Sequence, residues 1–317
     1  MRIVFLDTDT VGNVSNIFRL REFGEFITYP LTPENLRIER VFGTDVVITN
    51  KVVIDKEVMD ACPGLKLICI AATGTNNIDL EVAREKGIVV KNVAGYSTES
   101  VAQSTFALLF YLLNKLRYYD NYVKSGEYCK SSIFTHHGRD IIQLYGKRFG
   151  VIGLGAIGNR VAEIAKVFGC ETVYHSTSGK NKNASGYKHL EINELLGTSD
   201  IVSIHCPLSE STKGLIDYHR LKMMKPSAYL LNMGRGGIVI EHDLARAINE
   251  GIIAGAGIDV LEHEPINKDN LLLTTNDSEK IVITPHVAWA GVDSRNLLID
   301  KIYHNIREFI KTTGQYF

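Results

Sequence analysis

The chain reads Val151-Ile152-Gly153-Leu154-Gly155-Ala156-Ile157-Gly158 near its middle, a G-x-G-x-x-G pattern. In a nucleotide-binding turn of this kind, the first glycine permits a tight turn and the second lets backbone approach a pyrophosphate. The third allows close packing of helix on strand. The pattern alone also occurs at ordinary strand-to-helix turns. Its neighbours favour the nucleotide site, because residues 148–152 have strand character and residues 159–168 form an amphipathic helical pattern that Gly169 is placed to end.

Composition indicates a globular protein of two domains. The chain has 317 residues, 45% of them hydrophobic and 22% charged, with a formal net charge of −1. Acidic and basic residues are interspersed. The net charge and its distribution therefore do not indicate binding to nucleic acid or to a membrane surface.

The cysteines and the N-terminus favour a cytoplasmic location. Five cysteines are scattered without a C-x-x-C or metal-ligand spacing, which is typical of free thiols in a reducing compartment. The N-terminus reaches the acidic Asp7 too early for a signal peptide. No apolar run reaches the roughly 18 residues that a membrane span needs.

The first 98 residues alternate short apolar strands with polar or helical stretches. Strands are expected at residues 2–6, 45–49, 67–71 and 88–91, a pattern typical of a parallel α/β sheet. Residues 71–75 follow the third strand, where such sheets place ligand loops. Gly74 there either presents bare backbone N–H groups to a carboxylate or serves a tight connection.

A long apolar helix is predicted over residues 98–117, followed by a polar and aromatic stretch over residues 118–145. A helix that is apolar on most faces needs neighbours on several sides. The aromatic stretch is expected to be an irregular arm that packs on a partner subunit. His136 and His137 lack further ligands, and we expect no metal there.

Six strands are predicted after residue 145, at residues 148–152, 172–175, 201–205, 228–232, 255–260 and 281–284. Six strands with crossovers match the doubly wound dinucleotide fold, of strand order 3-2-1-4-5-6. An amphipathic helix over residues 294–312 is expected to return to the first domain. We therefore expect residues 99–290 to bind a dinucleotide, and residues 1–98 with 291–317 to form a discontinuous substrate-binding domain.

Three ionisable residues follow consecutive strands of the second sheet, where parallel sheets bind ligands. Arg235, between glycines, can hold a carboxylate through two parallel hydrogen bonds. Glu264 and His286 follow the next two strands. Each alone is more typical of an ordinary loop residue, but together they form an acid–base set in which a carboxylate orients the histidine.

These motifs resemble the D-isomer-specific 2-hydroxyacid dehydrogenases over nearly the whole chain. The resemblance rests on the glycine loop, the Asn-x-x-Arg-Gly block at residues 232–236, the Asp-Val…Glu-Pro block at residues 259–265 and Pro285-His286. Residues 72–79 and 285–289 look most like the glycerate dehydrogenase (hydroxypyruvate reductase) branch. The fold class implied is α/β, with a Rossmann-type doubly wound parallel sheet and a flavodoxin-like substrate domain.

The resemblance also implies roles for individual residues. His286 would be the general acid–base, Glu264 its partner, and Arg235 the residue that binds the substrate carboxylate. Backbone groups of Ala72, Thr73 and Gly74 would hold the same carboxylate. The cofactor would be held by the glycine loop at Gly153, Gly155, Ala156, Ile157 and Gly158, by Asp259 at the nicotinamide carboxamide, by Cys206 and Pro207 at the adenine, and by Thr105 across the cleft.

The end of the second strand favours NADP(H) slightly over NAD(H). Family members that use NAD typically carry an aspartate there, which binds the ribose 2′-hydroxyl and repels a 2′-phosphate, whereas this chain has Ser176. Ser176, Thr177 and Ser178 can donate to that phosphate, and Lys180 adds positive charge.

The resulting interpretation is an NAD(P)-dependent enzyme that reduces a small 2-keto acid, hydroxypyruvate or glyoxylate, as a homodimer. D-lactate and phosphoglycerate dehydrogenases remain alternatives within the family. The latter often carry an extra C-terminal regulatory domain, which is not expected in a chain that ends at Phe317. Outside enzymes, the alternative is a nucleotide-sensing corepressor. Long disordered tails would favour that alternative, and this sequence lacks them.

Overall fold

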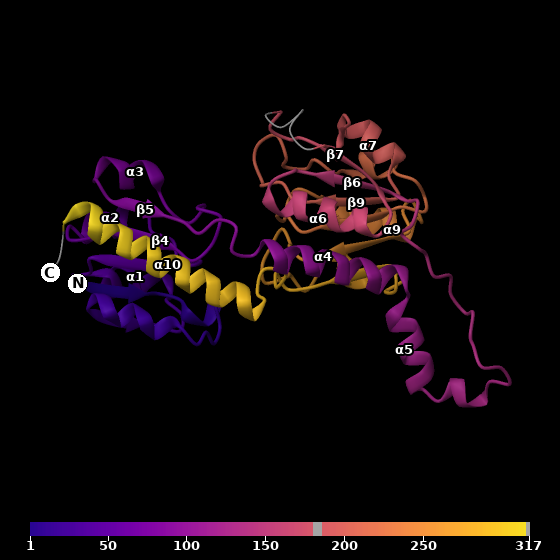
Figure 1. Cartoon of the computed structure of the whole chain (residues 1–317), viewed down its shortest axis with the longest axis horizontal. Helices are drawn as coiled ribbons and strands as arrows, with labels where there is room; N and C mark the ends of the chain where they lie inside the picture. The colour runs from indigo at the N-terminus through magenta and orange to yellow at the C-terminus, as the bar shows by residue number, and fades with distance from the viewer. Residues whose placement is uncertain (180–185, 315–317) are drawn as a thin grey trace. The chain divides into compact units, whose positions relative to one another are not determined.

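The chain folds into two compact units in the computed structural model, which describes residues 1–179 and 186–314. Unit 1 comprises Met1–Ser97 and Trp289–Phe317, and unit 2 comprises Thr98–Ala288 (Figure 1). Across the described residues, no helix combines the length and apolar character that crossing a membrane requires.

Unit 1 is built on a five-stranded, all-parallel sheet of order β2-β1-β3-β4-β5. This is the 2-1-3-4-5 order of flavodoxin-like folds. Its strands are β1 (Arg2–Phe5), β2 (Glu25–Thr28), β3 (Val46–Thr49), β4 (Leu67–Ile70) and β5 (Val89–Lys91). The sequence predicted four of them and missed β2, because this edge strand has only partly buried and exposed residues and no apolar run.

Both faces of this sheet are covered, as parallel sheets require. Successive residues of β1 point to opposite faces, so Ile3 and Phe5 join one core while Val4 and Leu6 join the other. The first core includes the 3-10 helix η2 (Ile17–Phe23) and the last helix, α10 (Val292–Thr313). The second core includes α1 (Arg37–Val41), α2 (Lys56–Ala61) and α3 (Leu80–Glu85).

Unit 2 is built on a seven-stranded parallel sheet of order β12-β11-β10-β9-β6-β7-β8. Its strands are β6 (Arg148–Ile152), β7 (Glu171–His175), β8 (Lys188–His189), β9 (Ile201–Ile204), β10 (Tyr229–Asn232), β11 (Gly255–Ile258) and β12 (Ile281–Ile283). The prediction of six strands was wrong by one. The missing strand is β8, whose two residues are too few to give a periodic pattern, and it takes the outer place beside β7. The order is thus the predicted 3-2-1-4-5-6 with β12 added beyond β11.

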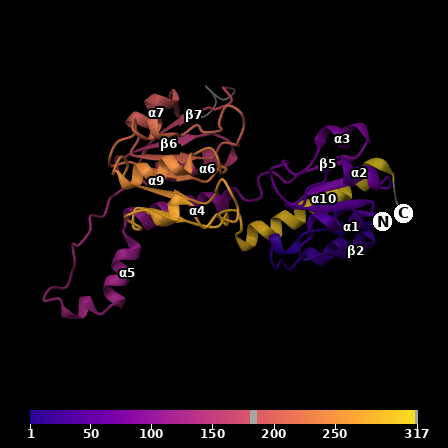
Figure 2. The same cartoon turned by 180° about the vertical axis from the view of Figure 1, so that it is seen from behind.

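Helices cover both faces of this second sheet. α4 (Thr98–Leu113) and α6 (Ala156–Val167) pack on one face, where Phe106 of α4 stacks on Phe149 of β6. α7 (Ile192–Thr198), α8 (Tyr218–Leu221) and α9 (Glu241–Asn249) contribute to the core on the other face. α6 therefore faces the viewer in Figure 1 and α9 in Figure 2.

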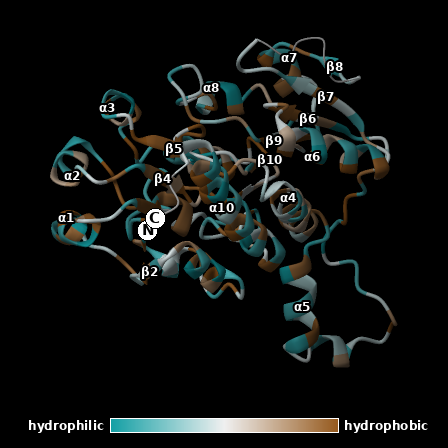
Figure 3. Cartoon of the chain, turned by 60° about the vertical axis from the view of Figure 1, so that its left-hand side comes forward, coloured by the Kyte–Doolittle hydropathy of each residue, from teal (hydrophilic) through white to brown (hydrophobic). Residues whose placement is uncertain are grey.

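The segment after α4 corrects two predictions. α4 ends at Leu113 rather than at residue 117, because Lys115 adopts a left-handed backbone with φ of 52°. The expected irregular arm then begins with a second helix, α5 (Leu116–Lys124), and the 3-10 helix η4 (Glu127–Lys130). Hydrophobic and hydrophilic residues alternate around α5, as Figure 3 shows. This amphipathic pattern was not recognised from the sequence, because tyrosines occupy three of the helix's nine positions.

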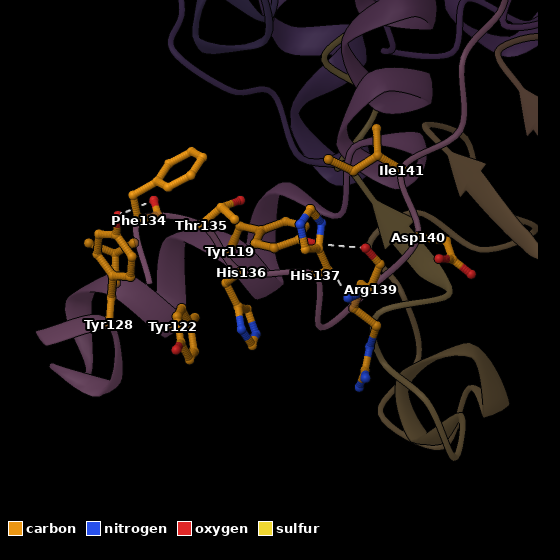
Figure 4. A pocket seen from close by; sticks show the side chains of 11 residues that line it. Tyr119, Tyr122, Tyr128, Phe134, Thr135, His136, His137, Arg139, Asp140 and Ile141 are labelled. Atoms are coloured by element: carbon orange, nitrogen blue, oxygen red, sulfur yellow. Dashed lines mark hydrogen bonds between the residues drawn. The ribbon is translucent and has the colours of Figure 1, made fainter. Parts of the chain in front are cut away.

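The arm projects from the rest of unit 2 and folds back on itself (Figure 1). His136 in the returning segment stacks on Tyr122 of α5 with ring centroids 3.8 Å apart, and its Nε2 lies 2.8 Å from the Tyr118 hydroxyl. A hollow of about 590 Å³ lies between α5 and the return segment, lined mainly by the arm's aromatic and histidine side chains (Figure 4).

Candidate active site

The glycine loop connects β6 to α6 with each glycine in a distinct steric role. Gly153 has φ of 90°, and a side chain there would meet the Cys206 backbone nitrogen at 2.6 Å. A Cβ on Gly158 would lie 2.1 Å from the Gly153 carbonyl oxygen, so only glycine permits this approach of helix and turn. A Cβ on Gly155, by contrast, would meet nothing within 4 Å. The open side of the loop is therefore at the second glycine, where a pyrophosphate needs bare backbone.

The start of α6 also fits an anion. The helix begins at Ala156, three residues before the predicted start, because Gly155 occupies the N-cap with extended backbone. No side chain caps this end and its first turn holds no acidic residue. Helix starts carry unsatisfied N–H groups and partial positive charge, which a phosphate complements. The far end confirms Gly169 as the terminating glycine, with φ of 80°.

Cys206 lies between two of the loops at the carboxyl edge of the sheet. Its backbone nitrogen would lie 2.6 Å from a Cβ on Gly153, and its carbonyl oxygen would lie 2.7 Å from a Cβ on Gly234. Burial raises the pKa of its thiol to about 11, so the thiol stays protonated at neutral pH. Pro207 follows it and is exposed. The cysteine therefore contributes packing and shape to this edge rather than a thiolate.

The end of β7 forms a turn at the predicted ribose position. The Gly179 N–H donates to the Ser176 carbonyl at 3.2 Å, which places Thr177 and Ser178 at the turn's centre. Ser176 is buried, Thr177 half-buried and Ser178 exposed. Lys180, the fourth residue predicted here, lies outside the described residues.

Asp259 organises the segment that carries His286. Its Oδ1 accepts from the Thr284 hydroxyl at 2.6 Å and from the Val287 N–H at 3.0 Å, and its Oδ2 accepts from the Ala288 N–H at 3.0 Å. Burial raises the pKa of this carboxyl, and the three hydrogen bonds act in the opposite direction. A carboxylate has about four acceptor positions, so one remains for a further donor such as an amide.

The backbone of His286 is held in an unusual conformation. Its φ is 53°, which is left-handed and costs a non-glycine residue roughly 1 kcal/mol. The His286 N–H donates to the Asp259 carbonyl oxygen at 2.8 Å. Asp259 thus fixes this residue through its main chain and the next two residues through its side chain.

His286 and Glu264, which the sequence predicts to be an acid–base pair, are in direct contact through their side chains. Nδ1 of the histidine lies 2.8 Å from Oε2 of the glutamate, and the other carboxylate oxygen accepts from the Leu261 N–H at 3.0 Å. The two side chains are 22% and 35% exposed, so the pair is reachable from solvent. With Nδ1 engaged, Nε2 is the nitrogen available to a substrate.

Arg235 lies in a loop fixed by Asn232, the last residue of β10. The Asn232 side chain accepts from the Gly234 N–H and donates to the Arg235 carbonyl oxygen, both at 3.1 Å. The arginine is half-buried, and its Nη1 donates to the Gly234 carbonyl at 2.9 Å. The remaining guanidinium donors suit a carboxylate.

Thr105 in α4 has no exposed surface, and its hydroxyl donates to the Val101 carbonyl one turn earlier at 2.7 Å. Its contact with a cofactor stays a prediction.

Ala72, Thr73 and Gly74 follow β4 in unit 1. Val93 and Asn92 donate to the carbonyl oxygens of Ala72 and Thr73, at 3.0 and 2.7 Å. Gly74 is not among the glycines with positive φ, so a left-handed turn does not explain it.

Comparison with known proteins decides the family. The sequence profile of the D-isomer specific 2-hydroxyacid dehydrogenase NAD binding domain matches residues 106–288, more than half of the chain. The chain belongs to this family. It is 36% identical to a hydroxypyruvate reductase of Blautia hydrogenotrophica over 92% of this chain and 91% of that protein. It is 34% identical to a glycerate dehydrogenase of Methylorubrum extorquens, over 98% and 96%.

A solved structure agrees with these relatives. An NADPH-dependent glyoxylate/hydroxypyruvate reductase from Sinorhizobium meliloti superposes with a TM-score of 0.82, at 26% identity over 98% of this chain and 95% of that one. As a D-2-hydroxyacid dehydrogenase family member, the chain is an oxidoreductase with a Rossmann-type α/β fold and a nicotinamide cofactor.

The sequence did not reveal the residues that brace the site. The hydrogen bond from the Thr284 hydroxyl to Asp259 joins segments 25 residues apart. The hydrogen bond from the Glu241 N–H to Glu262 joins segments 21 residues apart. No local spacing signals such contacts. Asn232, which fixes the Arg235 loop, is the exception, because it lies in the Asn-x-x-Arg-Gly block at residues 232–236.

Proposed function

We propose that this dehydrogenase reduces hydroxypyruvate or glyoxylate to the corresponding 2-hydroxy acid, using NAD(P)H and His286 as the proton donor. The observation that carries the proposal is the His286–Glu264 pair on the loops that follow β12 and β11, with Arg235 after the neighbouring β10. The names of the relatives support the substrate class.

Each protein group has a defined task in this reaction. The nicotinamide, when bound, supplies the hydride that the carbonyl carbon accepts. Arg235 binds the substrate carboxylate and polarises the carbonyl. His286 donates the proton from Nε2 to the carbonyl oxygen, and Glu264 stabilises the imidazolium before that transfer. Oxidation of the alcohol uses the same groups in reverse.

Unit 2 is proposed to hold the cofactor. Residues 153–158 would bind the pyrophosphate, Asp259 the carboxamide, and Cys206 with Pro207 the adenine. Thr105 would also contact the cofactor. Ala72, Thr73 and Gly74 of unit 1 would hold the substrate carboxylate through backbone groups.

NADP(H) is the preferred cofactor in this proposal. The turn after β7 has hydroxyl side chains and no carboxylate among residues 176–179. A 2′-phosphate therefore meets donors and no repelling charge. Equal or higher kcat/KM with NADH would refute this preference.

The arm supports a homodimer. It exposes several large apolar side chains, Phe134 at 90%, Ile133 at 59% and Val123 at 54%. Such a cluster outside the core marks an interaction surface. Sedimentation should give a dimer mass for the wild type and a monomer for Phe134→Asp, and a wild-type monomer mass independent of concentration would refute the dimer.

A cytoplasmic location completes the proposal. All five cysteines are free thiols, and four of them are buried, which suits a reducing compartment. Recovery in an oxidising compartment on cell fractionation would contradict it.

The test of function is a panel of keto acids assayed with both cofactors. Hydroxypyruvate and glyoxylate should give the highest kcat/KM, above pyruvate and phosphohydroxypyruvate. A higher kcat/KM for pyruvate than for the other keto acids would indicate a lactate dehydrogenase. No turnover with any substrate would instead favour a nucleotide-binding regulator.

A further inference from the structure

Helix α9 begins without a cap from its own N-cap residue. Its N-cap position is Ile240, whose side chain has no hydrogen-bond acceptor. The first N–H groups of a helix need acceptors, which serine, threonine, aspartate or asparagine normally supply at this position.

The missing acceptor comes from the loop that carries Glu264. The Glu241 N–H donates to Oε1 of Glu262 at 3.0 Å. In return, the Glu262 N–H donates to Oε1 of Glu241 at 2.5 Å. The second carboxylate oxygen of Glu241 accepts from the Asn270 side chain, and Glu241 is only 9% exposed. The two glutamates thus form a reciprocal bridge between α9 and the loop.

This bridge lies where two functional loops touch. A Cβ on Gly236, the residue after Arg235, would be 1.8 Å from the Leu261 carbonyl oxygen, so the two backbones are in direct contact. The Leu261 N–H donates to Glu264, and Glu264 contacts His286. Glu262 is therefore two residues from the carboxylate whose position the chemistry needs.

We propose that Glu262 and Glu241 are positioning residues that hold the 261–264 loop so that Glu264 stays aligned with His286. Neither touches the reacting atoms. Their catalytic effect rests on the proposed function, whereas their effect on the loop does not.

Amide hydrogen exchange of the protein without ligands tests the loop directly. In Glu262→Ala, the Leu261 amide should exchange at least about tenfold faster, because its acceptor Glu264 is no longer held. The control is Glu194→Ala, an exposed glutamate on α7, which should leave this amide unchanged. Wild-type exchange at Leu261 in Glu262→Ala overturns the inference whatever the activity.

Kinetics separate positioning from mere stability. Glu262→Ala should lower kcat about tenfold while KM for the keto acid stays within about twofold, since a small misplacement affects the chemical step first. Glu262→Gln keeps the acceptor oxygen and should retain kcat within about threefold.

The double variant Ile240→Asp/Glu262→Ala is the decisive control. Aspartate at position 240 supplies a local cap, so the melting temperature should recover. The loop remains detached, so kcat and Leu261 exchange should not recover. Recovery of all three would show that Glu262 only stabilises the helix and would overturn the proposal. One further outcome separates the two proposals. If the wild type reduces no keto acid but Leu261 exchanges faster in Glu262→Ala, the proposed function is refuted and the loop inference stands.

Discussion

Nδ1 of His286 lies 2.8 Å from Oε2 of Glu264, although 22 residues separate them in the chain. The histidine sits on a left-handed backbone that Asp259 holds, and the glutamate sits in a loop bridged to α9. Two independent supports therefore fix the relative position of this histidine and this glutamate, as a pre-organised site requires.

Replacing Glu264 by glutamine should lower kcat about 10- to 150-fold, since a charge-assisted hydrogen bond to the imidazolium is worth roughly 1.5–3 kcal/mol. KM for the keto acid should change little, because Arg235, the residue proposed to bind the substrate carboxylate, is intact. Steady-state kinetics with glyoxylate measure both, with Glu194→Gln as the exposed control. Wild-type kcat in Glu264→Gln would remove the glutamate from the mechanism.

Arg235→Lys should lower kcat/KM for the keto acid by roughly 10- to 150-fold, mostly through KM. Lysine keeps the charge but not the two parallel donors. The matched control is Arg246→Lys on the exposed face of α9, where arginine pairs with Glu250. Equal kinetics for the two variants would show that Arg235 does not bind the carboxylate.

Ser176→Asp should lower kcat/KM for NADPH at least about tenfold and change the value for NADH only a few-fold, because a carboxylate repels the 2′-phosphate. Kinetics with both cofactors check this, and the melting temperature controls for the cost of a charge at this buried position. If the ratio of kcat/KM for NADPH to kcat/KM for NADH is unchanged, Ser176 does not lie beside the cofactor's ribose.

The sequence anticipated the parts of the molecule that depend on local pattern. Gly153 to Gly158, the strand before them and the glycine that ends α6 were all read from spacing, and the structure shows the same elements. Edge strand β2 and the two-residue β8 were missed, because neither has an apolar run. α5 was missed because its tyrosines were taken for an irregular arm. The bridge between Glu241 and Glu262 depends on a tertiary contact that no periodicity reports.

His205 should make folding stability depend on pH. Burial lowers its pKa from 6.5 to about 3, so between these values the unfolded chain binds a proton that the folded chain does not. Stability should therefore rise with pH across this window, by on the order of 1 kcal/mol per unit, and level off above it.

Denaturant unfolding from pH 4.5 to 7.5 measures this slope. His205→Gln should flatten it, while His219→Gln, at an exposed position on α8, should not. An unchanged slope in His205→Gln would mean that other groups set the acid sensitivity.

The most direct test of the proposed mechanism is to measure the turnover of His286→Ala and of the wild type with NADPH and hydroxypyruvate. Loss of the proton donor predicts a kcat lower by about 10²- to 10⁴-fold in a protein with the wild-type fold by circular dichroism. Turnover near that of the wild type would contradict the assignment of His286 as the acid–base, and with it the mechanism proposed for this site.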